Sequence, residues 1–192
     1  MCGRLSQYRG IHDFVAVLSI PDALINHVGD AALERYNAAP INARVEKVAH
    51  GPFFRAIWRH RLIVPIDNWF EWVDGPDKTR QPWLIRRADH GPVFCAAIGQ
   101  FPTPDSDAQD DDGFVIITAD SIGGLLDIHD RRPVVFRADM AAEWLDPATP
   151  AERAEQMLLF EGEASEAFAW HKVGTAVGNS RNQGAGLIDE VA

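Results

Sequence analysis

Four short runs rich in β-branched and aromatic residues constrain the fold of this chain more than any other feature. Each has the length of one strand and is bounded by turn-forming residues or by an acidic loop. They are LIVPI (62–66), NWFEWV (68–73), PVFCAAIGQF (92–101) and GFVIITA (113–119). Closely spaced strands with few helices between them favour an α+β fold, mainly antiparallel, with a barrel-like core and short flanking helices. The length of 192 residues predicts one domain, 1–192.

The segments outside these runs predict the rest of the secondary structure. Helical segments are expected at 11–19, 137–145 and 151–160, because apolar side chains recur there or because proline and glycine bound them. YNAAP (36–40) has no periodicity and is predicted to be an irregular loop. One or two further strands are expected near 168–173 and 187–188.

Charge limits the classes of partner. The net charge of −10 argues against nonspecific, histone-like binding of nucleic acid. Residues 44–87 nevertheless hold nine Lys or Arg against five Asp or Glu, a balance of +4. A polyanion docked on this region and an ordinary solvated surface explain these counts equally well.

Apolar and cysteine content indicate the compartment. No run approaches the roughly 20 apolar residues that cross a bilayer, and MCGRLSQYRG has no apolar stretch of the signal-peptide kind. Cys2 and Cys95 cannot form a disulfide framework, and Cys95 falls within an apolar strand where it is expected to be inert. We expect a cytoplasmic protein without a membrane partner.

Cys2 is the first candidate for chemistry. Removal of Met1 before this small residue would expose a thiol and an α-amine on neighbouring carbons. The pKa of such an amine is about 7.7–8.0, so part of it is neutral at physiological pH. The two groups condense with an aldehyde to a thiazolidine, or attack an acyl group as N-terminal nucleophiles do. The alternative is an ordinary small residue beside a translation start.

Glu71 and His129 are candidates for proton transfer. Glu71 lies among Trp69, Phe70 and Trp72, and desolvation there would raise the pKa of its carboxyl into the range of general acid–base catalysis. His129 begins HDRRP, where neighbouring charges suit a proton shuttle or a phosphate clamp. The alternatives are a water-facing glutamate at a strand edge and a histidine in a surface turn.

The remaining candidates are weaker. Asn42 and Arg44, in INARVEK (41–47), offer amide and guanidinium donors, or make ordinary loop hydrogen bonds. The seven histidines include no pair at metal-ligand spacing with cysteine or carboxylate, and no glycine-rich phosphate loop is present. We therefore predict no metal and no cofactor.

Together these segments resemble the SRAP family, the SOS response-associated peptidases. The similarity follows the order of the chain over nearly its whole length. It is carried by MCGR at the start, RYNAAP (35–40), INARVE (41–46), WFEW (69–72), AAIG (96–99), IITA (116–119), DIHDRRPVV (127–135) and AVGN (176–179).

The resemblance implies a sensor of abasic sites in single-stranded DNA. The mature N-terminal cysteine, Cys2, would capture the opened sugar aldehyde as a thiazolidine and shield the lesion covalently. Asn42 would orient the cysteine and the sugar, Glu71 would assist ring opening, and His129 would serve the Schiff-base step. An AP-lyase nick and autoproteolytic loss of Met1 are also implied.

The resemblance further implies the partner and its contacts. The partner would be single-stranded DNA with abasic sites, bound by a monomer that is associated with the nucleoid when crosslinked. The implied DNA-binding residues are Arg4, Asn37, Pro40, Arg44, Trp72, Thr118 and Arg131.

One departure from the family lies between Pro40 and Ile41. Family members carry about two strands with a Trp-Gly pair there, whereas here Pro40 is followed directly by INAR. We interpret this as a missing segment that costs DNA affinity and leaves the four catalytic candidates in place.

Two other function classes stay open. One is a thiol peptidase with an N-terminal nucleophile, which needs an oxyanion hole and a peptide groove. The other is a noncatalytic protein that binds single-stranded DNA and has no need of the Cys2 thiol.

Overall fold

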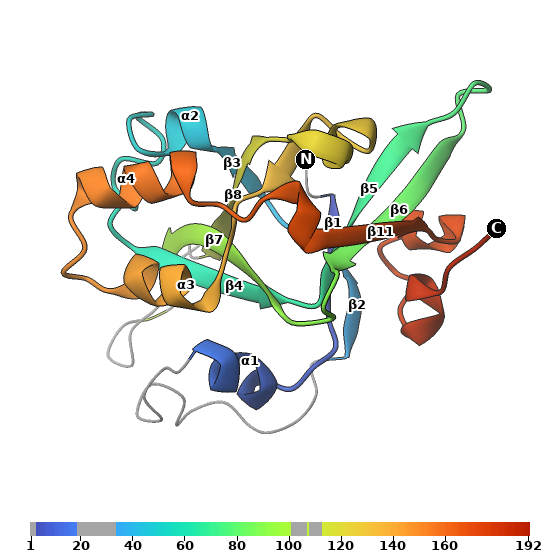
Figure 1. The fold of residues 1–192 in the computed structure, drawn as a ribbon, viewed down its shortest axis with the longest axis horizontal. Coiled ribbons are helices and arrows are strands. Elements are labelled where there is room, and N and C mark those ends of the chain that lie inside the picture. Colours follow the sequence, from blue (N-terminus) through green and yellow to red (C-terminus); the bar gives the residue numbers. More distant parts are fainter. Residues whose placement is uncertain (1–2, 19–33, 101–106, 108–112) are drawn as a thin grey trace.

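The structure is a computed structural model that describes residues 3–18, 34–100, 107 and 113–192. The cysteine at position 2 lies outside the described residues. The elements form two β-sheets, with short helices around them (Figure 1).

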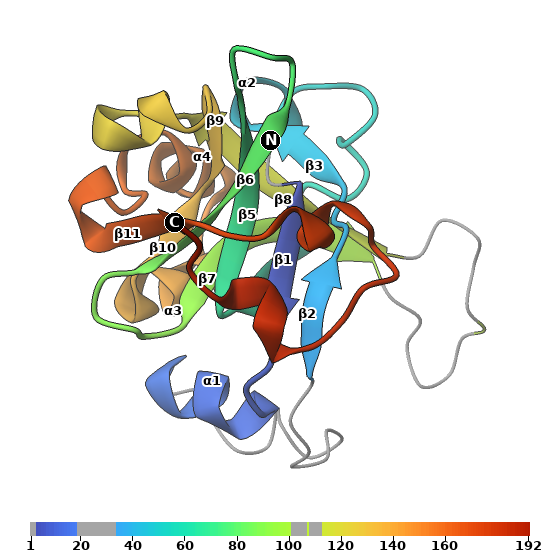
Figure 2. The same cartoon turned by 90° about the vertical axis from the view of Figure 1, so that its right-hand side faces the viewer.

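The first sheet has five strands, all antiparallel to their neighbours, in the order β11-β6-β5-β1-β2. Figure 2 shows β1 between β2 and β5. The strands are β1 (Arg4–Gln7), β2 (Arg35–Ala38), β5 (Asn68–Asp74), β6 (Arg80–Arg87) and β11 (Phe168–Lys172).

The second sheet has six strands and is built around β7 and β8. β7 pairs with β4, β8 and β10, while β8 also pairs with β9 and with β3. The β3–β8 pair is parallel and the other pairs are antiparallel. The strands are β3 (Asn42–Arg44), β4 (Arg61–Ile66), β7 (Val93–Gln100), β8 (Gly113–Asp120), β9 (Arg131–Pro133) and β10 (Val135–Phe136).

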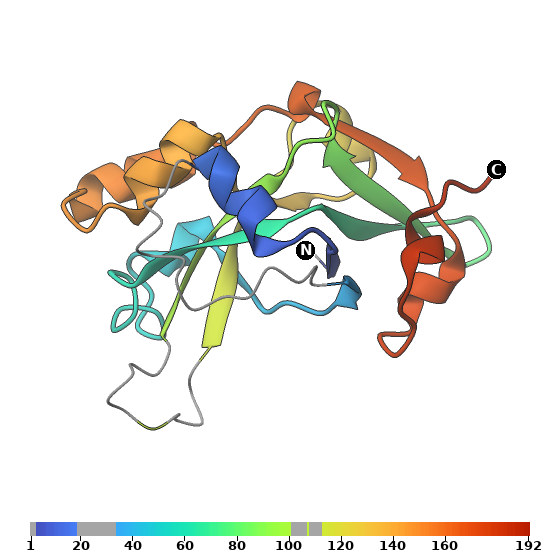
Figure 3. The same ribbon diagram turned by 90° about the horizontal axis from the view of Figure 1, so that it is seen from below.

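The helices are short and lie outside the sheets. Helices α3 and α4 lie side by side, with α1 packed against α3 (Figure 3). They are α1 (Ile11–Leu18), α2 (Val45–Val48), α3 (Ala138–Leu145) and α4 (Ala151–Phe160), with 3-10 turns η2 (Gly123–Asp127), η3 (Ser165–Ala167), η4 (Thr175–Gly178) and η5 (Ala185–Ile188).

Strand β5 is covered on both faces. Because successive side chains point to opposite faces of a strand, Trp69 packs into the core between the two sheets, and Phe70 packs against the C-terminal segment around Val177. Both rings are almost fully buried. Glu71 and Trp72 follow these two residues, so their backbone is held in place by a fully packed part of the strand.

The predicted α+β class and the mainly antiparallel sheets are confirmed. All four β runs form strands, and the three predicted helices occur at 11–18, 138–145 and 151–160. Within the described residues the sheets do not close on one another, so "barrel-like" describes them only loosely.

Two local predictions are wrong. YNAAP is not a loop throughout, because residues 35–38 form β2 and pair with β1. Residues 187–188 are not a strand and lie in the 3-10 turn η5. In both places a tertiary contact decides the backbone conformation: the edge of β1 in the first case and the packing of Leu187 against Phe70 and Val177 in the second.

The packing of α3 on the second sheet gives a test of stability. Trp144 is fully buried against Trp58, and its indole N–H donates to the Leu62 carbonyl at 2.8 Å. Trp144→Ala should lower the free energy of unfolding by about 3–5 kcal/mol, since it opens a cavity and removes that donor. Urea unfolding measures the loss. Trp83→Ala, at a half-buried position of β6, is the control, and an equal loss there would contradict this account.

Candidate active site

A cavity of about 580 Å³ gathers most of the candidate residues. Its walls come from both sheets, from the loop before β9 and from η4, so no single sequence segment builds it. The lining residues are Gly3, Arg4, Pro40, Asn42, Glu71, Trp72, Arg80, His129 and Gly178.

Glu71 is the buried acid of this cavity. It lies in β5 opposite Trp83 of β6 and is 3% exposed, so it is not the water-facing glutamate of the alternative interpretation. Burial raises the pKa of its carboxyl to about 8, and the nearby Asp130 carboxylate acts in the same direction. The Glu71 carboxyl therefore holds its proton at neutral pH and is able to donate it.

His129 faces Glu71 across the cavity. Its Nε2 lies 4.0 Å from the Glu71 Oε2, within reach of a small reorientation or a bridging group. Burial lowers the pKa of the imidazole, so the neutral ring is favoured near pH 7. A neutral imidazole and a protonated carboxyl at this distance form an acid–base pair that is ready to move protons.

Two groups compete for the other ring nitrogen of His129. The Arg131 backbone N–H points at Nδ1 from 2.9 Å, and the Asp130 carboxylate lies 2.7 Å from the same atom. Nδ1 accepts from Arg131 when it carries no proton and donates to Asp130 when it does. In the neutral ring that accepts from Arg131, the proton lies on Nε2, the atom nearest to Glu71.

Asn42 enters the cavity from the second sheet. β3 pairs with β8 in parallel, with Asn42 opposite Ile116, and this pairing brings INAR beside the end of β1. Residues 39–41 cross directly from β2 in the first sheet to β3 in the second, and Pro40 lines the cavity at this crossing. The short junction therefore keeps both flanking motifs at the site.

The structure brings six of the eleven predicted residues together. Of the expected catalytic set, only Cys2 is outside the described residues, and its neighbour Gly3 lines the cavity. The six are Arg4, Pro40, Asn42, Glu71, Trp72 and His129.

Three predicted DNA contacts are buried away from the cavity wall. The Asn37 amide donates to the carbonyls of Val177 and Asn179, and the Thr118 hydroxyl donates to the Ala43 carbonyl. The Arg131 side chain is 6% exposed, and its guanidinium donates to carboxylates and to the Thr118 carbonyl. These contacts hold the elements of the site in place, and a DNA contact by any of the three stays a prediction.

Arg44 is exposed on β3 and does not line the cavity. Sequence reasoning also missed Arg80, whose strand β6 was not predicted. A signal was present, since Asp74 and Arg80 flank a turn-forming stretch in the manner of a hairpin. That pattern would have placed Arg80 three strand positions from Glu71.

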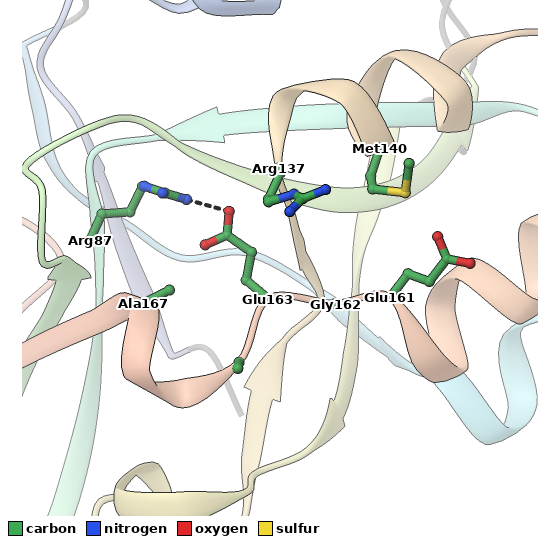
Figure 4. Close-up of a pocket in the computed structure, with 8 residues that line it drawn as sticks. Arg87, Arg137, Met140, Glu161, Gly162, Glu163 and Ala167 are labelled. Carbon is green, nitrogen blue, oxygen red and sulfur yellow. Dashed lines mark hydrogen bonds and ion pairs between the residues drawn. The ribbon is translucent and has the colours of Figure 1, made fainter.

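A second cavity, of about 450 Å³, lies between β6 and the segment before β11. Figure 4 shows the Glu163 carboxylate turned toward Arg87, with which it forms an ion pair, while Arg137 and Met140 line the opposite side. The Arg132 guanidinium donates to the Glu163 carbonyl. These contacts join β6, β9 and the loop before η3.

Neither a membrane span nor a metal cluster occurs in the part of the chain that the structure describes. No described helix is long and apolar enough to cross a bilayer. No three His, Cys, Asp or Glu side chains among the described residues are grouped so that they could hold a metal ion.

Comparison with known proteins gives consistent matches. The model of the family "SOS response associated peptidase (SRAP)" matches residues 23–180. The abasic site processing protein YedK of Escherichia coli is 36% identical over the full length of both chains. The abasic site processing protein YoaM of Bacillus subtilis is 30% identical over 81% of this chain and 68% of its own.

Two solved structures share the fold. A phage-related protein of Bordetella bronchiseptica superposes with a TM-score of 0.75 at 30% identity, over 95% of this chain and 99% of its own. A protein of Bacteroides thetaiotaomicron has a TM-score of 0.77 over the full length of both chains; at 17% identity it supports the fold alone.

The YedK alignment also bears on chain length. It extends over 225 positions, whereas this chain has 192 residues, so at least 33 positions of the relative have no counterpart here. A difference of this size is compatible with the missing segment predicted between Pro40 and Ile41.

Proposed function

The chain belongs to the SOS response associated peptidase family, and we propose that it captures abasic sites in single-stranded DNA as a covalent adduct of Cys2. The observation that carries the proposal is the pairing of a buried, protonated Glu71 with a neutral His129 in a cavity beside Gly3. Two relatives that align with all or most of this chain are named abasic site processing proteins.

The chemistry begins with the abasic sugar. The carboxylic acid of Glu71 donates a proton to the ring oxygen as the C1–O bond breaks, and the C1 hydroxyl gives its proton to water, which leaves the aldehyde. The α-amine of processed Cys2 then attacks the aldehyde carbon, a C–N bond forms, and water leaves to give a Schiff base. The Cys2 sulfur adds to the imine carbon, the nitrogen takes up a proton, and a five-membered thiazolidine results.

His129 and Asn42 support these steps. With its proton on Nδ1 and donated to Asp130, the imidazole has Nε2 free to relay protons between Glu71 and the departing water or the imine nitrogen. The Asn42 amide, fixed by the β3–β8 pairing, orients the thiol and the opened sugar. The same Schiff base also allows strand cleavage by β-elimination. Met1 must be removed before any of these steps, because the α-amine of Cys2 is otherwise part of a peptide bond.

DNA contacts follow from the lining of the cavity. Arg4 is placed for a phosphate, and Pro40 and Trp72 give apolar surface for an unstacked base. Arg44 lies further along the exposed side of β3 and extends the positive surface. The protein acts on this DNA in the cytoplasm, without metal or membrane, as a monomer.

Denaturing electrophoresis tests the proposed function. Three single-stranded oligonucleotides are compared: one with an abasic site, one with a tetrahydrofuran analogue that has no aldehyde, and one intact. We expect a heat-stable protein–DNA band with the aldehyde-bearing oligonucleotide alone. No stable band with any of them, together with cleavage of a peptide substrate, would replace this proposal by the thiol-peptidase alternative.

A further inference from the structure

Arg80 lines the cavity that holds Glu71 and His129, and it comes from the end of β6 next to the hairpin turn. It lies in register with Asp74 of β5, and its Nε is 3.2 Å from an Asp74 carboxylate oxygen. The side chain is 63% exposed, so the guanidinium is at the mouth of the cavity.

We propose that Arg80 binds a backbone phosphate of the DNA strand next to the abasic nucleotide. The inference rests on the proposed function and adds to it a specific anion-binding residue of the same site. Its ligand is a phosphodiester, because the guanidinium presents a planar fork of donors that matches two phosphate oxygens.

The geometry of the Asp74 pair leaves this fork available. Asp74 contacts Nε of Arg80, and no other ion-pair partner of the guanidinium lies among the described residues. The two terminal amino groups are not used in that contact and are the donors for a phosphate. Arg131, in contrast, has both terminal nitrogens engaged by Glu46, Asp120 and Thr118.

Moving the Arg80 guanidinium from Asp74 to a phosphate costs little free energy. Both partners are more than half exposed, 63% for Arg80 and 80% for Asp74, and an ion pair of this kind contributes only about 0–1 kcal/mol. Asp74 therefore keeps the Arg80 side chain near the cavity while no DNA is bound.

Arg80 lies within electrostatic range of the reacting groups. Its charge opposes the effect of burial on the pKa of Glu71, and it adds to the lowering of the pKa of His129. A phosphate bound to Arg80 thus lies beside the cavity that holds the abasic sugar. This is the position of the phosphate that flanks that sugar in the strand.

The test is the salt dependence of binding by Arg80→Ala, with Arg137→Ala as the matched control. Arg137 also forms an exposed ion pair, with Asp139 two residues away, and it lines the second cavity instead of this one. Binding of an abasic single strand is measured from 50 to 200 mM salt, and capture is measured at saturating DNA. Thermal melting of each variant verifies that it is folded.

We expect Arg80→Ala to reduce the slope of log K against log salt by about 0.7, the contribution of one phosphate contact on a single strand. Affinity should fall at least about 10-fold, as for a lost hydrogen bond between charged groups. Capture at saturating DNA shows how much of the loss lies outside binding, since the Arg80 charge also acts on the pKa of Glu71 and of His129. Arg80→Lys keeps the charge and should restore the slope but only part of the affinity, and Arg137→Ala should match wild type.

Two results would overturn the inference in distinguishable ways. If wild-type protein captures abasic DNA and Arg80→Ala has the same slope as Arg137→Ala, Arg80 does not bind a phosphate and the proposed function is unaffected. If wild-type protein neither binds nor captures abasic DNA, the proposed function fails and this inference fails with it.

Discussion

Cys2→Ser protein should form no heat-stable adduct with abasic single-stranded DNA, a loss of effectively the whole crosslinked product. Serine keeps the α-amine after Met1 removal, so a Schiff base with the aldehyde still forms. Its hydroxyl closes a far less stable ring than sulfur does, and hydrolysis releases the DNA. The measurement is denaturing electrophoresis with and without borohydride, which reduces the Schiff base to a stable amine.

The borohydride arm separates the roles of the amine and the sulfur. Cys2→Ser should give a band only when borohydride is present, whereas wild type gives a band in both lanes. Cys95→Ser is the matched control, because Cys95 is fully buried in β7 and burial raises the pKa of its thiol, which keeps it unreactive. A wild-type level of heat-stable adduct from Cys2→Ser would exclude the thiazolidine.

Glu71→Gln should slow capture at pH 7 by about 100-fold, the usual contribution of a positioned general acid. The glutamine keeps the size of the side chain and its hydrogen-bonding capacity but has no transferable proton. Wild-type capture should also fall as the pH rises through about 8, where the Glu71 carboxyl ionises, and Glu71→Gln should lack this decline. Single-turnover capture rates from pH 6 to 9.5 measure both effects.

The same substitution should stabilise the fold in alkaline solution. The pKa of Glu71 is raised in the folded protein, so its contribution to stability is fully present below the ordinary pKa near 4.5 and is lost as the pH rises through about 8. At pH 8.5 the free energy of unfolding of Glu71→Gln should therefore exceed that of wild type by at least about 1 kcal/mol, and its melting temperature should be higher. At pH 4 the two proteins should melt at similar temperatures. A variant less stable than wild type at pH 8.5 would contradict the buried, protonated carboxyl, and Glu152→Gln on α4 serves as the exposed control.

Strands made mostly of apolar residues could be predicted from the sequence. Strands that combine apolar residues with charged residues or proline could not. β7 is buried along nearly its whole length, so its composition alone indicates a strand. β6 carries charges at both ends and Pro82 within it, and it forms because β5 and β11 pair with it on either side. β2 is a similar case, since its pairing with β1 is invisible to local periodicity.

The candidate site shows the same division. The burial of Glu71 could be inferred from its aromatic neighbours, and the side chain is indeed buried, while its role in catalysis stays a prediction. The meeting of Glu71 with Asn42 and His129 depends on long-range strand pairing, for which only the family resemblance gave a guide. The burial of Asn37 and Arg131 could not be foreseen, because polar side chains that hold a fold together look like polar side chains that bind a ligand.

Intact-protein mass spectrometry before and after mixing with an abasic single-stranded oligonucleotide tests the central claim most directly. The account predicts that the protein lacks Met1 and that a species appears with the mass of protein plus oligonucleotide minus one water, the balance of imine formation followed by ring closure. Processed protein that remains entirely at its own mass after mixing would contradict capture by the N-terminal cysteine.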